Sequence, residues 1–252
     1  MSMPALFESA WYDLFYAIRT FRLNKGFFAI ATLSLALGIG ANTAIFQLLD
    51  AVRLRTLPVS HAGELAQLKI AKNEHCCNGH FSGRHSDFTY AQWEQIRHQQ
   101  QAFSNVFAWG DQRFNLAEGG EPRFAEGLWV TGDFFKTLAV QPLLGRVITT
   151  MDDHAGCGSP GVVISYSFWQ RQFAGDPGAL GKQVSVDGHR LDIIGITPAN
   201  FFGVEVGKSF DVAVPVCAEP LLNGENSQLA KRNGWWLAII GRLKPGWTMQ
   251  RP

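Results

Sequence analysis

Hydrophobic residues are unevenly distributed along the chain, and their longest concentration lies near the N-terminus. No charged residue lies between Lys25 and Asp50, and 16 of the 23 residues from Phe27 to Leu49 are apolar. At about 1.5 Å per residue, a helix of this length reaches about 34 Å and crosses a hydrocarbon core of about 30 Å. The pattern therefore predicts a transmembrane helix over Phe27 to Leu49, within a segment of residues 26–50.

Two other interpretations of this run are weaker. A buried helix of a soluble protein rarely has so many consecutive uncharged residues. A cleaved signal peptide has an apolar core of only about 7–15 residues, and the 26 residues ahead of this run include the acids Glu8 and Asp13. We therefore expect a helix that stays attached to the protein.

The charges on the two sides of the run differ. Three basic residues without a nearby acid precede it, and two basic residues with Asp50 follow it: Arg19, Arg22 and Lys25 before, Arg53 and Arg55 after. By the positive-inside rule, this difference favours a cytoplasmic N-terminus. Residues 51–252 are then expected outside the cytoplasm.

The segment ahead of the run has its own pattern. Between Ala5 and Arg22, apolar residues recur at helical spacing, and the charged residues lie largely on other faces. The apolar members are Phe7, Trp11, Leu14, Phe15, Ile18 and Phe21. Residues 1–25 are therefore predicted to form a cytoplasmic amphipathic helix, either lying in the membrane interface or packed on protein.

Beyond Asp50 the pattern offers no second span and alternates between strands and helices. Helices are predicted from a cap at Ser86 to about Gln101, in a short piece starting at Thr131, and over residues 167–173. Strands are predicted over residues 106–109, 113–117, 124–130, 161–165, 183–186, 190–196, 211–216 and 235–243. Asp187 and Gly188 join two strands in a hairpin, because both residues tolerate a left-handed backbone. The fold class is therefore α+β, with one domain over residues 51–252.

Aromatic residues inside these patterns are predicted to lie in the core. They are Trp109, Trp129, Trp169, Trp235 and Trp236. Phe201 and Phe202 stand between Pro198 and Gly203, which leaves two interpretations open. The pair forms either an exposed apolar loop for a partner or a loop tucked under the core.

Composition excludes two classes of protein. The 22 basic and 21 acidic residues give a net charge of +1, which lacks the basic excess typical of nucleic-acid-binding proteins. The 46% of hydrophobic residues is too high for a disordered chain. Charged residues make up 17%, below the roughly 25% of soluble domains, and the charge-free run near the N-terminus accounts for part of the deficit.

No catalytic or cofactor-binding motif is found, so we expect a protein that is not an enzyme. The sequence has neither G-x-S-x-G nor H-E-x-x-H. The nearest approach to a phosphate-binding loop has five residues rather than four between Gly175 and Gly181, and Gln183 replaces the Ser or Thr that would bind magnesium. The adjacent acids Asp152 and Asp153 are either an acid/base or calcium pair or, as is more usual, a solvated turn.

Histidines and cysteines gather in one segment, His75-Cys76-Cys77-Asn78-Gly79-His80, with His85 nearby. Their side chains suit zinc, but adjacent cysteines reach one ion less easily than a C-x-x-C pair does. A solvated polar loop is therefore the better interpretation, and no metal site is assigned.

Four cysteines are candidates for disulfide bonds: Cys76, Cys77, Cys157 and Cys217. Three pairings are possible, and the sequence does not choose among them. A bond between adjacent cysteines is strained. We therefore expect either one of the first two bonded to one of the last two, or no bond.

The chain resembles the start of ABC-transporter permeases of the MacB and FtsX type from Asp13 to Val59, DLFYAIRTFRLNKGFFAIATLSLALGIGANTAIFQLLDAVRLRTLPV. Further blocks are similar to the MacB-like periplasmic core domain and extend the resemblance over most of residues 13–248. They are VTGDFFKTLAVQPLLGRVITTMDD, VVISYSFWQRQFAGDPGALGKQVSVDG, IIGITPANFFG, DVAVPV and WWLAIIGRLKPGWT.

The resemblance implies a first transmembrane helix in the cell inner membrane and a periplasmic domain of β-α-β units. It also implies a homodimer or a paired permease half, a separate cytoplasmic ABC ATPase subunit and a periplasmic partner protein. In such systems the periplasmic domain relays nucleotide-driven motion to a substrate or partner, and the ATPase performs the chemistry. No catalytic, cofactor or metal residue is therefore expected in this chain, and nucleic acid is not a partner.

One feature departs from the resemblance. Permeases of this type carry further spans after the periplasmic domain, whereas this sequence stops at Pro252. We therefore expect a truncated product, a partial sequence or one piece of a split permease. The alternative function is a stand-alone, membrane-anchored periplasmic binding module without ATP coupling; an anchored hydrolase has no motif to support it.

Overall fold

The structure is a computed structural model that describes residues 11, 19–20, 23–49, 57–70, 78–154, 156–157 and 161–247. The chain divides into two compact units, Met1–Arg55 and Thr56–Pro252. The vicinal pair Cys76 and Cys77, together with His75, lies outside the described residues.

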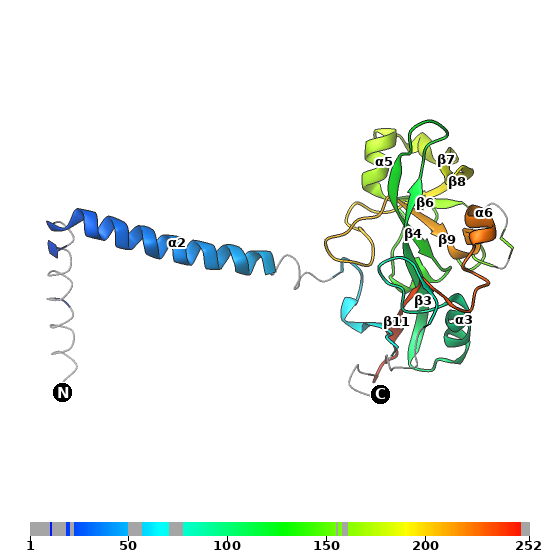
Figure 1. Cartoon of the computed structure of the whole chain (residues 1–252), viewed down its shortest axis with the longest axis horizontal. Helices are drawn as coiled ribbons and strands as arrows, with labels where there is room; N and C mark the ends of the chain where they lie inside the picture. Colours follow the sequence, from blue (N-terminus) through cyan, green and yellow to red (C-terminus); the bar gives the residue numbers. More distant parts are fainter. Residues whose placement is uncertain are drawn as a thin grey trace. The chain divides into compact units, whose positions relative to one another are not determined.

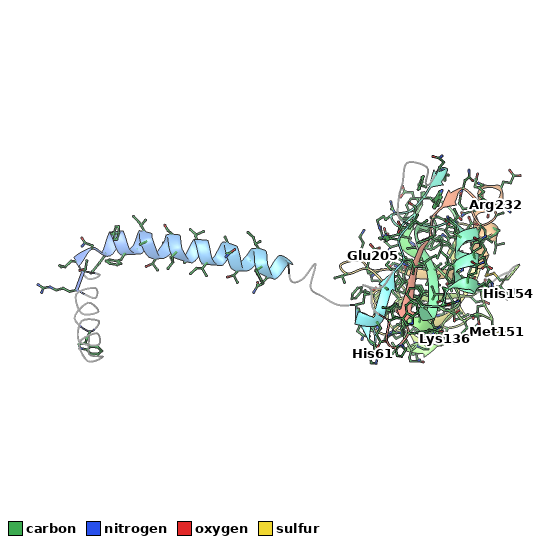
Figure 2. All side chains as sticks on the ribbon, turned by 90° about the horizontal axis from the view of Figure 1, so that it is seen from below. His61, Lys136, Met151, His154, Glu205 and Arg232 are labelled. Atoms are coloured by element: carbon green, nitrogen blue, oxygen red, sulfur yellow. A yellow bond between two sulfur atoms is a disulfide. The ribbon has the colours of Figure 1, made fainter. Side chains whose placement is uncertain are left out.

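The first unit contains helix α2, Lys25–Leu49, which includes the predicted span (Figure 1). Side chains project on all sides of this helix (Figure 2), and large apolar ones such as Phe27 and Leu35 are 71% and 67% exposed. Within the described part of the chain, α2 is the one helix long and apolar enough to cross a membrane. The predicted interfacial helix ahead of it lies mostly outside the described residues, in which Trp11, Arg19, Thr20 and Leu23 are helical.

The second unit is built on a mixed sheet with the strand order β1-β11-β3-β4-β9-β6-β8-β5, in which β7 also pairs with β8 (Figure 1). The strands are β1 (Leu65–Gln67), β3 (Phe103–Asn115), β4 (Phe124–Val130), β5 (Leu144–Gly145), β6 (Val162–Ile164), β7 (Gln183–Val186), β8 (His189–Ile196), β9 (Val212–Pro215) and β11 (Ala238–Leu243). β4 is parallel to β9, and β6 is parallel to β8. A separate parallel pair joins β2 (His80–Phe81) and β10 (Gly234–Trp235).

Four short helices accompany the sheet: α3 (Tyr90–Gln99), α4 (Phe134–Thr137), α5 (Tyr166–Phe173) and α6 (Glu219–Asn223). Single 3-10 turns complete the described elements: η2 (Ala62–Glu64), η3 (Pro177–Ala179), η4 (Val216–Ala218) and η5 (Gly224–Asn226). The path from β6 through α5 and β7 returns to β8, parallel to β6, so it is a β-α-β crossover. The mixed α+β class expected from the sequence is confirmed.

Both faces of the sheet are buried. Along β3, Val106 and Ala108 pack in one cluster, and Phe107 and Trp109 pack in the other, as the two-residue period of a strand requires. The first cluster includes side chains of α3 and α5, and the second includes side chains of α4. The five tryptophans predicted to lie in the core are all buried. Phe201 is 3% exposed, so it is tucked under the core.

Helix α3 begins later than the sequence suggested. Its N-cap is Thr89, not Ser86: the Thr89 hydroxyl accepts the Gln92 N–H, and the Gln92 side chain accepts the Thr89 N–H. This reciprocal capping box satisfies two backbone donors and fixes the start at Tyr90. Phe88, predicted to lie inside the helix, instead precedes it and is 4% exposed.

Strand β3 is one long strand where the sequence predicted two, over residues 106–109 and 113–117. Gly110, in the predicted gap, lies within the strand and pairs with Trp129 of β4. A Cβ atom at this position would lie 2.6 Å from the carbonyl oxygen of Trp236. The glycine therefore permits a close approach of backbone rather than a break in the strand. The predicted hairpin is confirmed, with Asp187 and Gly188 at φ 48° and 83°.

Arg242 on β11 holds the segment that enters the second unit. Its guanidinium donates to the carbonyl oxygens of Ser60 at 2.8 Å, His61 at 3.1 Å and Thr137 at 2.9 Å. It also pairs with the Glu64 carboxylate at 3.0 Å, and the Arg242 side chain is 15% exposed. One nearly buried cation therefore joins residues 60–64 to β11 and to the end of α4.

We expect Arg242→Ala to lower the free energy of unfolding by about 2–4 kcal/mol, because several carbonyl oxygens lose a charged donor. Denaturant unfolding of the full chain, followed by tryptophan fluorescence, measures this change. Arg113→Ala is the control, because the Arg113 side chain is 65% exposed and lies 3.7 Å from Glu126. Its expected effect is below about 1 kcal/mol. Equal losses for the two variants would contradict the role given to Arg242.

Candidate functional site

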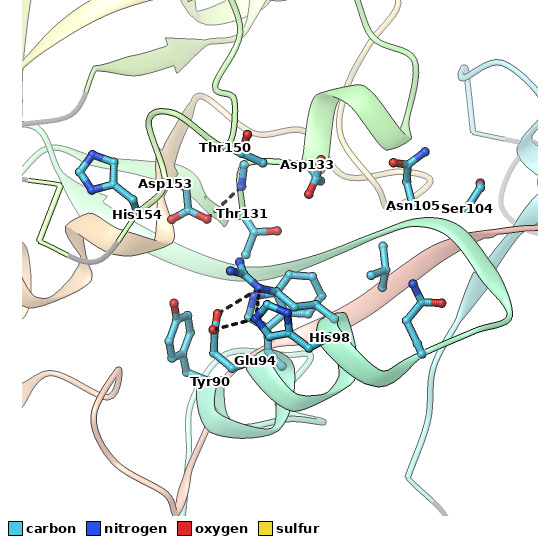
Figure 3. A pocket seen from close by; sticks show the side chains of 15 residues that line it. Tyr90, Glu94, His98, Ser104, Asn105, Thr131, Asp133, Thr150, Asp153 and His154 are labelled. Carbon is cyan, nitrogen blue, oxygen red and sulfur yellow. Dashed lines mark hydrogen bonds and ion pairs between the residues drawn. The ribbon is translucent and has the colours of Figure 1, made fainter.

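A cavity of about 510 Å³ lies against one face of α3 (Figure 3). Three further parts of the second unit line it: the start of β3, the residues that follow β4, and the loop of residues 149–154. Its lining residues are Tyr90, Trp93, Glu94, Arg97, His98, Gln100, Ser104, Asn105, Val106, Thr131, Gly132, Asp133, Thr150, Asp153 and His154.

Helix α3 supplies the cavity's alternating charges. Glu94 lies four residues after Tyr90, and Arg97 and His98 lie three and four residues after Glu94, so these side chains share one face of the helix. One Glu94 carboxylate oxygen lies 3.5 Å from the Arg97 Nε, and the other lies 3.9 Å from the His98 Nε2. Glu94 is thereby shared between two basic side chains. Trp93 of the same helix is 2% exposed.

Asp153 faces these residues across the cavity (Figure 3). One oxygen of its carboxylate accepts the Gly132 N–H at 2.9 Å, and the other accepts the Cys217 N–H at 3.0 Å. Gly132 follows β4 and Cys217 follows β9, which are parallel neighbours. A single carboxylate therefore connects the carboxyl ends of two parallel strands.

Burial governs the ionisation of the groups around Asp153. Burial raises the pKa of the Asp153 carboxyl, and the backbone donors of Gly132 and Cys217, together with the positive charge of Arg97, only partly oppose it. Burial also raises the pKa of the Tyr90 hydroxyl, helped by the negative charges of Glu94 and Asp153. Within the described part of the chain, Asp153 forms no ion pair with a cationic side chain. The cavity therefore holds a carboxylate whose charge is poorly compensated.

The neighbouring acid has a different role. Asp152 forms an ion pair with the Arg146 guanidinium at 2.8 Å and accepts the Thr149 N–H at 2.9 Å. Burial alone would raise the pKa of Asp152, but the hydrogen bonds from Arg146 and Thr149 outweigh it and lower that pKa. The two acids thus point to different partners. They form neither a shared acid/base or calcium pair nor a simple solvated turn, because each carboxylate anchors the loop to another part of the fold.

A disulfide holds the same loop. Cys157 is bonded to Cys217, with their Cα atoms 5.9 Å apart. This pairing corrects the expectation that Cys76 or Cys77 would bond to one of them, or that no bond would form. The physical reason is proximity: the Cys217 N–H already donates to Asp153, four residues before Cys157. The sequence contains no signal for this proximity, because 60 residues separate the two cysteines.

The other candidate ligands lie elsewhere. His85 Nε2 lies 2.9 Å from a Glu205 carboxylate oxygen, and the Arg84 guanidinium lies 3.2 Å from the other. His80 belongs to β2. No group of three or more His, Cys, Asp or Glu among the described residues could hold a metal ion. The Gly175 to Gln183 segment includes a short 3-10 turn capped by Asp176, which accepts the Gly178 N–H.

Sequence reasoning assigned no role to most residues of this cavity. The spacing of Tyr90, Glu94 and Arg97 on one helical face was a readable signal. Nothing in the sequence placed Asp153 opposite that face, because the contact depends on strand ends and a loop that are distant in sequence. The cavity is therefore a product of the tertiary fold.

The sequence profile described as the MacB-like periplasmic core domain matches residues 28–251. No curated protein matches the chain significantly.

Three solved structures are similar to parts of the chain. The extracellular domain of the noncanonic ABC-type transporter YknZ from Gram-positive bacteria is 13% identical, with 72% of this chain and 83% of that chain covered and a TM-score of 0.48. The periplasmic region of MacB from Actinobacillus actinomycetemcomitans is 15% identical, with 73% and 75% covered and a TM-score of 0.47. A domain of a permease protein from Porphyromonas gingivalis is 18% identical, with 62% of each chain covered and a TM-score of 0.40.

We expect replacement of both Cys157 and Cys217 by serine to lower the free energy of unfolding by roughly 2–4 kcal/mol, because the cross-link no longer restricts the unfolded chain. Denaturant unfolding of the full chain measures the loss. Peptide mapping without reduction, after free thiols are blocked, provides the check on pairing. A peptide joining Cys157 or Cys217 to Cys76 or Cys77 would contradict the assignment.

The stability of the ion pairs at Glu205 should depend on pH. Burial alone would raise the Glu205 pKa, but His85 and Arg84 outweigh it, so the folded-state pKa lies below the ordinary value. The stabilisation is therefore complete above the unfolded-state pKa and is lost as the pH falls through the folded-state pKa. Glu205→Gln should reduce the loss of stability on acidification, measured by unfolding between about pH 6 and pH 3. An unchanged pH dependence would contradict this.

Proposed function

Because the chain belongs to the family of the MacB-like periplasmic core domain, we propose that it is a membrane-anchored permease component that works with a separate ATPase. Its extracytoplasmic domain passes ATP-driven motion to a substrate or partner protein. The observation that carries this proposal is the extent of the family match, residues 28–251, which includes the apolar helix as well as the domain. Chemistry belongs to the ATPase, so no catalytic residue is assigned to this chain.

The charges beside the predicted span and the disulfide of the domain support one orientation of the chain in the membrane. Residues 1–25 are cytoplasmic or interfacial, residues 26–50 cross the inner membrane, and residues 51–252 form the periplasmic domain. The basic residues ahead of the span favour a cytoplasmic N-terminus. The disulfide between Cys157 and Cys217 supports an oxidising compartment for the domain.

The contacts of Arg242 support a role in transmitting motion. The segment that follows the predicted span enters the domain at residues 57–64 and continues into the edge strand β1. β1 pairs with β11 from Leu65 to Gln67, and Arg242 of β11 binds the carbonyl oxygens of Ser60 and His61. A displacement of this segment would therefore pull on the sheet through hydrogen bonds as well as through the chain.

The mechanism proposed is a shift between two arrangements of a homodimer, or of two paired permease halves, driven by nucleotide on the ATPase. The periplasmic domain then presents two different surfaces to its partner protein. No residue is assigned a substrate contact on this basis.

We expect an ABC ATPase to co-purify with the full chain, tagged at one end and extracted from its native membrane in mild detergent. Added ATP should be hydrolysed by the recovered complex. Failure to recover an ATPase would instead favour the stand-alone binding module.

A tag at the C-terminus should be removed by protease added to spheroplasts, whereas a tag at the N-terminus should survive; the opposite result would contradict the orientation.

A further inference from the structure

The cavity against α3 contains a carboxylate, that of Asp153, with which no cationic side chain among the described residues forms an ion pair. The two Asp153 oxygens accept one backbone N–H each, and no described side chain forms an ion pair with this residue. The buried acid Glu219 shows the contrast, because the side chains of Asn223 and Ser227 and two backbone N–H groups donate to it. Burying a charge is unfavourable unless it is paired or fully hydrogen-bonded. Asp153 therefore leaves room for a positively charged partner.

The charged residues that line the cavity also favour a positively charged ligand. Its lining includes three acids and one permanently charged base: Glu94, Asp133 and Asp153 against Arg97. Arg97 and His98 are already engaged by Glu94, and Lys136, which is outside the lining, lies 4.0 Å from Asp133. Arg97 acts on Asp153 only through space and forms no ion pair with it, so the described lining keeps an excess of negative charge. A cation is therefore the ligand that this lining favours.

The carboxylate is held in place before any ligand arrives. The loop that carries Asp153 is bonded to the domain through Cys157 and Cys217, and the adjacent Asp152 pairs with Arg146 at 2.8 Å. Its own hydrogen bonds fix both oxygens. A binding group held by its neighbours loses little freedom on binding, which favours affinity.

Trp93, another residue of the lining, carries an unsatisfied hydrogen-bond donor. The Trp93 side chain is 2% exposed, and its indole Nε1–H has no acceptor among the described residues. The amide of Asn105 and the hydroxyl of Thr150 also line the cavity. An oxygen atom of a ligand would give this neutral, polar part of the lining a partner.

We propose that this cavity binds a small hydroxylated organic ammonium ion, with the ammonium at the Asp153 carboxylate and ligand oxygens toward Trp93 and Asn105. The cavity volume of about 510 Å³ lies within the range of roughly 300–1,000 Å³ typical of small-molecule sites. An organic cation fits better than a metal ion, because the described acids and histidines do not converge as a ligand set. This binding is independent of the proposed coupling to an ATPase.

The first test compares three sugars that share a ring and differ in charge: glucosamine, N-acetylglucosamine and glucose. Each is titrated into the full chain in lipid nanodiscs at about pH 6.5, where a primary amine is protonated. Calorimetry measures affinity, and the indole N–H resonance of Trp93, assigned with Trp93→Phe, reports the site. We expect saturable binding of glucosamine with a shift of that resonance, and at least tenfold weaker binding of the two neutral sugars.

Two results would overturn the proposal. Equal binding of the neutral sugars would show that charge does not select the ligand. No saturable binding of glucosamine up to about 10 mM would show that the site does not take this class of cation.

Paired variants locate the site. Asp153→Asn should weaken glucosamine binding at least tenfold, whereas Asp192→Asn, at an exposed acid outside the lining, should not. Because the Asp153 hydrogen bonds also hold the loop, a second pair of variants leaves Asp153 unchanged. Thr150→Arg places a competing cation at an exposed lining residue and should abolish binding, whereas Met151→Arg, at a residue that is 82% exposed outside the lining (Figure 2), should not. Equal effects within this second pair would overturn the assignment to this cavity.

Discussion

Burial of both faces of one long strand is the constraint on which the periplasmic-type domain depends. β3 contributes side chains alternately to two hydrophobic clusters, so neither face of the sheet can be left to solvent. Residues of α3 and α5 pack in one cluster, and residues of α4 pack in the other. Gly110 keeps the strand continuous where another backbone approaches it closely. The positions of the helices, and hence of the cavity beside α3, follow from this two-sided burial.

Polar contacts at β4, β9 and β11 connect the Asp153 loop and the entering segment to the sheet. After β4 and β9, Asp153 accepts one N–H from each strand end, and a disulfide fixes the same loop to the second. On β11, Arg242 donates hydrogen bonds to the carbonyl oxygens of the entering segment. In both places one charged side chain satisfies backbone groups from separate parts of the chain, which connects the loop and the entering segment to the sheet.

Local patterns in the sequence identified much of the fold, and each failure has an identifiable physical cause. The Asp187-Gly188 hairpin was predictable because its turn conformation depends on two adjacent residues. The start of α3 was misplaced because Thr89 and Gln92 form a capping box that competes successfully with Ser86. The two-strand interpretation of β3 failed because a glycine can mark either a turn or a close backbone approach, and only the neighbouring Trp236 decides which.

The sequence by itself determined the family, the α+β class and the position of an apolar helix long enough to cross a membrane. These properties depend on composition and on short periodic patterns, which each segment carries on its own. Only the tertiary structure decided that Cys157 pairs with Cys217, that Asp152 and Asp153 have separate partners, and that Asp153 faces α3. Those contacts join segments far apart in sequence, and their geometry exists only after the sheet has brought the strand ends together.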